Sequence, residues 1–156
     1  MNRMSRSATS MKKPEPGTLQ TYASLRFSGD ELEPQRLTAI LNARPEVAYR
    51  KGDVFKVSRG HEVRGRTGVW VISSKGDLPS LDLNEHLDYL LGLLFPEGSE
   101  AKLNRLHELM RECNIEADAP CFWYGEHGAK PPVIREDIRD RLARIPAEIW
   151  ADFDTD

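Results

Sequence analysis

The chain has 156 residues, a formal net charge of −3, 39% hydrophobic residues and 30% charged residues. This length favours one domain, which buries roughly 70% of its unfolded surface and so needs neither disulfides nor metal to form a core. The composition is that of a globular protein and not of a disordered or membrane-embedded one. The longest apolar run, Tyr89 to Phe95, is far shorter than the ~18 residues that a membrane helix needs. We therefore expect a soluble globular domain.

Residues 1–17 differ in charge from the rest of the chain. They carry four basic side chains and one acidic side chain, which are Arg3, Arg6, Lys12, Lys13 and Glu15. Because no apolar stretch follows these charges, the segment does not have the pattern of a secretory signal. We expect a disordered basic tail over 1–17, with contact to nucleic acid or acidic lipid as the alternative. The single α+β domain is predicted over 18–156, where the formal charge is −6, which argues against a nucleic-acid binder.

The two cysteines, Cys113 and Cys121, have a spacing that fits neither a zinc site nor a redox pair. Cys113 falls on the apolar side of a predicted helix, and Cys121 begins a predicted strand. We expect both to be buried free thiols, which are typical of a reducing compartment. The predicted location is therefore the cytoplasm.

The clearest strand is predicted over residues 19–27, where apolar and polar residues alternate. The alternate positions that should face the core include Leu19, Ala23, Leu25 and Phe27. The positions between them, which should face away from the core, include Tyr22, Ser24 and Arg26. A helix then begins near Pro34, because proline suits the first helical position, and Asn42 and Pro45 end it.

The rest of the chain gives the remaining elements in order. We predict a short strand over 47–49, a long loop over 50–67 and a strand over 68–74 whose apolar residues on both faces favour a central place in the sheet. Two helices follow, with apolar stripes from Leu83 to Leu94 and from Leu103 to Cys113. The last predicted elements are a strand over 121–124, a helix over 134–145 and a strand over 149–153.

This order, β-α-β, β-α-(α)-β, α-β, is typical of α+β proteins. Strands separated by crossover helices in a short chain predict a ferredoxin-like sheet with the helices packed on one face. One face of such a sheet stays open, and each strand sends half of its side chains there. We expect a ligand or partner to bind on this open face, at Tyr22, Ser24 and Arg26.

Several segments resemble a bacterial family, number 4279 in the domain-of-unknown-function series. They include Ser28-Gly29-Asp30-x-Leu32-x-Pro34, Arg50-Lys51-Gly52-Asp53, Thr67-Gly68-Val69-Trp70-x-Ile72 and Leu83-x-x-His86-Leu87. The resemblance spans roughly Thr21 to Phe153. It implies a compact α+β domain, and the family supplies no established activity and no catalytic residues.

The loop over 50–67 is a second candidate site. It holds six basic and two acidic side chains, which are Arg50, Lys51, Lys56, Arg59, Arg64, Arg66, Asp53 and Glu62. With its three glycines it resembles a flexible arm that could hold phosphate or an acidic partner, with Arg50, Lys51 and Asp53 as binding residues. The alternative is a solvated loop whose charges pair with the acidic body. The glycine spacing fits neither a P-loop nor a dinucleotide-binding motif.

Catalytic and metal-binding patterns are weak in this sequence. The four histidines are scattered, at His61, His86, His107 and His127, and lack the close pairs that metal sites use. Asp152 and Asp154 could act together in acid–base catalysis, but carboxylates near a chain end are more often charges that keep an edge strand soluble. We predict no metal and no cofactor, and we lean against an enzyme.

Three functions remain open. The first is a non-enzymatic interaction module, similar to an immunity protein or antitoxin, that binds another protein or forms a homodimer. The second is a sensor or binding domain for a small ligand, which rests on analogy of fold. The third is an enzyme of unrecognised chemistry. Nucleic acid and membrane are not expected as partners.

Overall fold

The computed structural model describes residues 15–156. Most of the predicted disordered tail therefore lies outside the described residues, and its disorder stays a prediction. The strands are β1 (Thr18–Gly29), β2 (Val47–Tyr49), β3 (Val54–Lys56), β4 (Glu62–Arg64), β5 (Gly68–Ser73), β6 (Glu116–Gly125) and β7 (Ala147–Thr155). The α-helices are α2 (Pro34–Leu41), α3 (Leu83–Leu94), α4 (Glu100–Glu112) and α5 (Glu136–Arg144).

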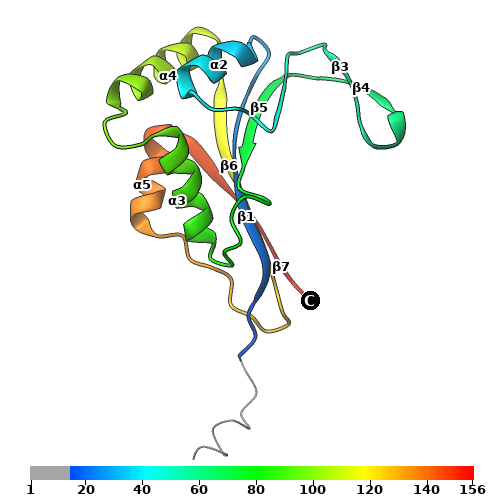
Figure 1. The fold of residues 1–156 in the computed structure, drawn as a ribbon, viewed down its shortest axis with the longest axis vertical. Coiled ribbons are helices and arrows are strands. Elements are labelled where there is room, and N and C mark those ends of the chain that lie inside the picture. The colour runs from blue at the N-terminus through cyan, green and yellow to red at the C-terminus, as the bar shows by residue number, and fades with distance from the viewer. Residues whose placement is uncertain (1–14) are drawn as a thin grey trace, which may run out of the picture.

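The main sheet has five strands in the order β2-β5-β1-β6-β7. Strand β1 lies at its centre and pairs antiparallel with β5 and β6, and β2 pairs antiparallel with β5. Strand β7 pairs with β6 in parallel, because α5 connects the two strands and returns the chain to the same end of the sheet. The protein is thus α+β, with a mixed sheet (Figure 1).

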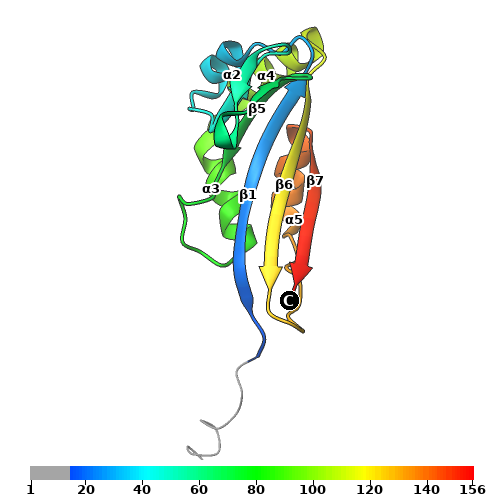
Figure 2. The same ribbon diagram turned by 90° about the vertical axis from the view of Figure 1, so that its right-hand side faces the viewer.

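The α-helices pack on one face of this sheet, and β1, β6 and β7 present their other face to the viewer in Figure 2. The core lies between sheet and helices. Its largest fully buried side chains include Trp70, Trp123, Phe27, Leu25, Leu37, Leu87, Leu90 and Leu106. The alternation predicted for the first strand is confirmed from Thr21 to Phe27, where every second residue is buried.

Side chains hold several helix ends in place. The carboxylate of Asp82 accepts a hydrogen bond from the backbone N–H of Asn84 (2.9 Å) at the start of α3, which satisfies a donor that has no partner inside the helix. Lys102 Nζ donates to the carbonyl oxygens of Leu94 (2.7 Å) and Leu41 (3.2 Å). One α4 side chain therefore caps the C-terminal ends of both α2 and α3.

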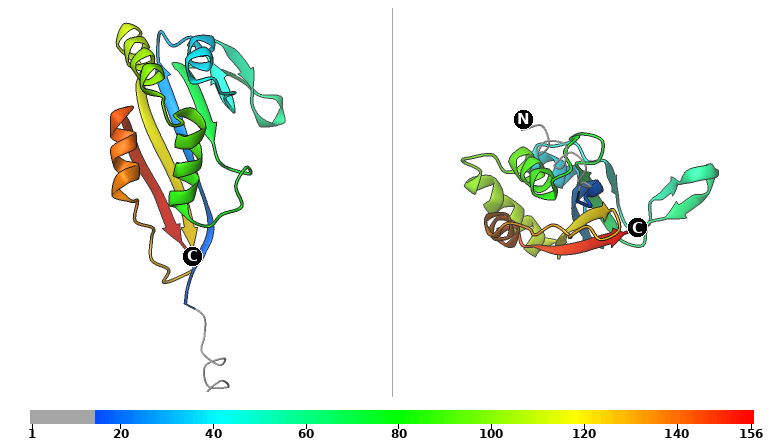
Figure 3. Two further views of the ribbon diagram at one scale, coloured as in Figure 1. Left: turned by 60° about the vertical axis from the view of Figure 1, so that its left-hand side comes forward. Right: turned by 90° about the horizontal axis from the view of Figure 1, so that it is seen from below.

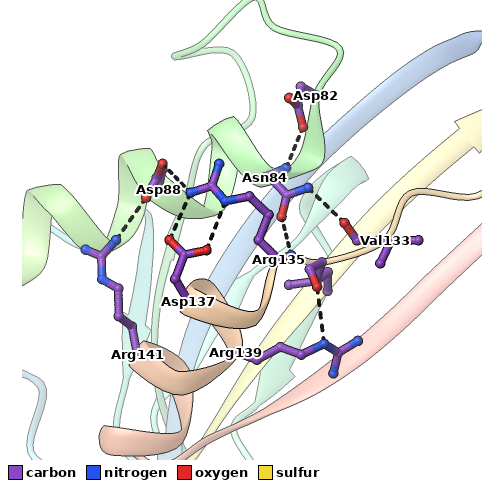
Figure 4. Close-up of polar contacts among 9 residues, drawn as sticks. Asp82, Asn84, Asp88, Val133, Arg135, Asp137, Arg139 and Arg141 are labelled. Carbon is purple, nitrogen blue, oxygen red and sulfur yellow. Dashed lines mark hydrogen bonds and ion pairs between the residues drawn. The ribbon is translucent and has the colours of Figure 1, made fainter.

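A polar cluster joins α5 to α3 (Figure 4). Asp88 on α3 accepts from Arg141 (2.9 Å) and from Arg135 (3.1 Å). Asn84 donates to the carbonyl of Val133 and accepts from the backbone N–H of Arg135. Asp137 also pairs with Arg135, and this contact lowers the pKa of the Asp137 carboxyl. Because these side chains are largely exposed, we interpret the cluster as a clamp for the connection before α5.

The structure corrects three details of the predicted elements. The predicted loop over 50–67 contains a two-stranded hairpin, in which β3 pairs with β4 around a short 3₁₀ turn at Ser58–Gly60. The predicted strand over 121–124 is the second half of β6, so Cys121 lies inside a strand and does not begin one. Leu19 is 47% exposed, because β1 has a register irregularity between Thr18 and Gln20.

Within residues 15–156, the structure shows no helix whose length and apolar character would suffice to cross a membrane. The burial predicted for the thiols is confirmed for Cys121, whereas Cys113 at the end of α4 is half-buried. Burial raises the pKa of the Cys121 thiol to about 12, so this thiol stays protonated and unreactive at neutral pH.

Candidate functional site

The open face of the sheet brings together side chains from each strand of the main sheet. Tyr22, Ser24 and Arg26 of β1 lie on this face, as the alternation of the sequence predicted, and all three are half-buried. Their partners across the strands also point to this side, because directly paired residues share a face. Tyr22 pairs with Phe122, and Ser24 pairs with Ser73.

Aromatic side chains occupy the middle of the open face. The rings of Tyr22 and Phe122 are stacked, with centroids 4.8 Å apart and an interplanar angle of 20°. Lys75 Nζ lies 5.1 Å from the centre of the Tyr22 ring, which is a cation–π contact. Trp150 of β7 is 57% exposed and pairs with Pro120 of β6 on the same side. An exposed tryptophan is the type of residue that dominates many protein interfaces.

An ion pair crosses the face between β1 and β6. Arg26 Nη2 lies 3.0 Å from Asp118 Oδ2, and the two residues are directly paired in the sheet. The second carboxylate oxygen, Asp118 Oδ1, is buried and has no hydrogen-bond partner in residues 15–156. A buried oxygen without a partner costs free energy, so this oxygen is a place where a donor from a bound molecule would be favourable.

The end of β7 is strongly acidic. Asp152 pairs with Phe122 and Asp154 pairs with Tyr124, so both carboxylates lie on the open face. Tyr124 donates a hydrogen bond to Asp156, and this contact raises the pKa of the phenol. The sequence suggested edge charges here. What it did not show is that these carboxylates lie beside the aromatic side chains of the face.

The second candidate site, which we call the arm, comprises residues 50–66 and contains the β3–β4 hairpin. Its proposed binding residues have local roles at its base. Asp53 accepts a hydrogen bond from the backbone N–H of Arg50 (2.8 Å). Lys51 Nζ lies 3.1 Å from Asp30 Oδ2, and this contact lowers the pKa of the Asp30 carboxyl. Both contacts lie at the base of the arm, and binding by Arg50, Lys51 and Asp53 stays a prediction.

The arm is joined to the sheet by an aromatic stack and a close backbone contact. The rings of Tyr49 on β2 and Phe55 on β3 have centroids 4.5 Å apart. Gly65 lies against the Tyr49 ring so closely that a Cβ atom there would be 2.8 Å from it. The arm stands away from the rest of the molecule (Figure 3). It projects toward the same side as the open face, opposite to α3 and α5 (Figure 1).

A serine–histidine pair was missed by sequence reasoning. Ser74 Oγ lies 2.6 Å from His86 Nδ1, and His86 Nε2 lies 2.7 Å from the carbonyl oxygen of Ser80. Ser74 Oγ also accepts from the backbone N–H of Ala23 (2.9 Å). Such a pair is typical of nucleophilic catalysis. Here Ser74 is completely buried and His86 is 1% exposed, so no substrate can reach the hydroxyl and the pair joins α3 to the sheet.

Other site types find little support in residues 15–156. No group of three or more His, Cys, Asp or Glu side chains in this part of the chain is placed to hold a metal ion. A hollow of about 210 Å³ lies between the α3–α4 connection and α5, lined by residues that include Leu91, Phe95, Leu103, Arg141 and Arg144. It is smaller than the usual ~300–1,000 Å³ of ligand pockets. Two hollows of about 380 Å³, beside Asp30 and Thr67, and about 420 Å³, beside Pro45 and Lys75, reach that size but are more open to solvent. All three are weaker candidates than the open face.

The family model described as "Domain of unknown function (DUF4279)" matches residues 19–156, in agreement with the resemblance noted in the sequence. No curated protein and no solved structure matches the chain.

Proposed function

We propose that this chain, which belongs to the DUF4279 family, is a non-enzymatic protein-interaction module whose open sheet face binds a basic protein surface. The observation that carries the proposal is the combination of aromatic and acidic side chains on this face. Trp150 is 57% exposed, and Asp152 and Asp154 lie on the same side of the same strand.

Charge argues for the type of partner. Strands β6 and β7 contain several acidic residues and no lysine or arginine. The residue after β7, Asp156, is acidic as well. On β1, the one basic side chain of the open face, Arg26, is already paired with Asp118. A partner that supplies lysine or arginine would therefore be attracted to the face and correctly oriented on it.

The alternatives have less support. An immunity-like or antitoxin-like role fits the proposal if the basic partner is a toxin. A small-ligand sensor would use the 210 Å³ hollow beside α5, where Arg144 could hold an anionic group next to Arg141, which is itself paired with Asp88. An enzyme has the weakest support, because the Ser74–His86 pair is buried. A cytoplasmic location remains part of the proposal.

We also propose that the first part of the sheet is ferredoxin-like. Strands β2, β5, β1 and β6 are neighbours in this order, and each adjacent pair is antiparallel. With α2 after β1 and α3 and α4 before β6, this arrangement is the one expected of a β-α-β-β-α-β unit. In this description β7 is an added strand at the edge.

Site-specific photocrosslinking in cells that express the full chain tests the proposed face. A photoreactive phenylalanine analogue replaces Trp150 on the face or, as the control, Val133, which is 82% exposed in the connection before α5. We expect a protein adduct from position 150 that position 133 does not give. The adduct should disappear when Asp152→Lys and Asp154→Lys are added, because the face then repels a basic partner.

Two results would count against the proposal. One is the absence of any protein adduct from position 150, and the other is an adduct that persists unchanged after the charge reversal. Mass spectrometry of the adduct identifies the partner, and a partner whose crosslinked surface is acidic would also contradict the proposal.

A further inference from the structure

We infer that the basic surface that fits the open face is the arm of a second copy of this chain, so that two chains exchange arms in a symmetric dimer. This inference rests on the proposed function and specifies its partner. It requires three features of one molecule: a basic projection, an acidic surface of suitable chemistry, and a placement that lets each chain use both.

The arm is the basic projection. Residues 50–66 carry six basic and two acidic side chains, a formal charge of +4 on a chain whose total is −3. Among residues 15–156, Lys51 is the one basic side chain of the arm that forms an ion pair. The other basic side chains of the arm, including Lys56 and Arg59 near the turn, are exposed and form no ion pair within residues 15–156, although Glu62 lies directly opposite Lys56 in the hairpin. These charges are available for carboxylates of another molecule.

The arm also carries apolar side chains in exposed positions. Val54 is 50% exposed, and Val57 and Val63 are each 40% exposed. A hairpin of three-residue strands gains little stability by itself, and exposed valines on it mark a surface that association would bury. Trp150 on the open face is an exposed apolar counterpart. Arm and face therefore match in apolar character as well as in charge.

The placement suits exchange between two copies. The arm lies at one end of the long axis and projects on the open-face side, whereas Asp156 and the acidic end of β7 lie at the opposite end (Figure 1). Two chains that face each other with their long axes antiparallel bring each arm to the acidic end of the partner. A chain cannot make this contact with itself, because its own arm and acidic end are at opposite ends.

A twofold arrangement also closes the assembly. Each chain contributes one arm and one face, so two contacts of the same kind form and no free arm remains. Direct pairing of two β7 edge strands is a competing way to form a dimer. It would bring Asp152 and Asp154 of one chain close to the same carboxylates of the other, and this repulsion disfavours it.

Charge exchange between arm and face provides the test. The arm variant carries Lys56→Glu and Arg59→Glu, and the face variant carries Asp152→Lys and Asp154→Lys. The mass of the full chain in solution is measured by sedimentation velocity across a concentration series at low and high salt. We expect the unchanged protein to form a dimer that salt weakens, and each variant alone to dissociate at least about tenfold more readily.

The decisive result is restoration. An equimolar mixture of the arm variant and the face variant should form a heterodimer, because the acidic arm then meets the basic face and the unchanged arm meets the unchanged face. A chain with all four substitutions should form a homodimer again. Restoration also shows that each variant is folded, so loss of the dimer cannot be ascribed to unfolding.

A matched control has the same change in charge elsewhere. Arg105→Glu and Arg111→Glu alter two exposed arginines of α4, and this variant should remain a dimer. The inference fails if the unchanged protein is a monomer at every concentration, if the control dissociates like the arm variant, or if the mixture does not restore the dimer. A monomer that still crosslinks through position 150 to a different protein would overturn the dimer and leave the proposed function standing.

Discussion

Arg26 Nη2 and Asp118 Oδ2 lie 3.0 Å apart in the middle of the open sheet face, where they form an ion pair between two directly paired residues of β1 and β6. The side chain of Arg26 is 39% exposed and that of Asp118 is 20% exposed. The arginine therefore gives the more buried carboxylate its charge partner, and the two residues should act as a unit in stability measurements.

Removal of the Arg26 side chain alone should lower the free energy of unfolding more than removal of both Arg26 and Asp118. Arg26→Ala leaves Asp118 without its partner beside a second oxygen that already has none in the described residues, so we expect a loss of about 1–3 kcal/mol. The double variant Arg26→Ala, Asp118→Ala should be more stable than the Arg26→Ala variant. Urea unfolding of the four proteins gives the coupling energy. If the stability losses of the two single variants add up to that of the double variant, the ion pair does not contribute to stability.

Substitutions on the core face of β1 should cost much more stability than substitutions in its first residues. Leu25 is 2% exposed, whereas Leu19 is 47% exposed. Leu25→Ala should cost about 2–5 kcal/mol, because it leaves a cavity under the helices, and Leu19→Ala should cost less than about 1 kcal/mol. Thermal unfolding of the two variants checks this difference, and equal losses would contradict the irregular register at the start of β1.

The Ser74–His86 pair should behave as a structural link. Ser74→Ala leaves His86 Nδ1 and the backbone N–H of Ala23 without their partner, which should lower the free energy of unfolding by about 1–3 kcal/mol. Ser73→Ala is the matched control, since Ser73 lies on the opposite face and is half-buried, and it should cost little. A fluorophosphonate probe should not label Ser74 in the folded protein. Labelling would reopen the possibility of an enzyme.

The two thiols should differ in reactivity. At about pH 8, a disulfide reagent should modify Cys113, whereas Cys121 should react only when the protein unfolds, because thiolate is the reactive form. The variant Cys113→Ser isolates the buried thiol and should show no rapid labelling. Rapid labelling of this variant would contradict the burial of Cys121.

The same burial predicts an effect of alkaline pH. The pKa of the Cys121 thiol is raised by burial from 9.0 to about 12, so the folded protein keeps a proton that the unfolded chain releases. The free energy of unfolding should therefore fall as pH rises above about 9, and the decrease should continue up to the folded pKa. In Cys121→Ala this contribution is absent, so its stability should fall less steeply between about pH 8 and pH 10. If the free energy of unfolding falls equally steeply with pH in the two proteins, the pKa of Cys121 is not raised by folding.

Much of the fold follows from short-range patterns in the sequence. The helices were predicted close to their observed bounds, because leucines and other apolar residues recur at helical spacing and clear signals such as Pro34 mark their ends. The beginning of β6 was missed for a physical reason. Ala117, Ala119 and Pro120 have low strand propensity, and they form a strand because β1 and β7 lie on either side of them.

The site was less predictable than the fold. The alternation in β1 gave the orientation of Tyr22, Ser24 and Arg26, but nothing local indicated that Phe122 and Asp118 would be their partners about 100 residues later. The buried Ser74–His86 contact depends likewise on packing between α3 and the sheet. The arm was predicted as a loop because its strands are only three residues long and are flanked by glycines, so they lack the long alternation that marks a strand.

The position of β1 has a consequence for the synthesis of the protein. Thr21 in this first strand hydrogen-bonds to Phe122, 101 residues away, and the centre of the sheet remains half-built until β6 has left the ribosome. Folds with many such distant contacts form more slowly than helical bundles. During that interval the apolar side of β1, including Leu25 and Phe27, is exposed in the nascent chain, where chaperones bind. The stability of the finished domain alone would therefore not predict its yield in the cell, because the yield should also depend on the rate of translation.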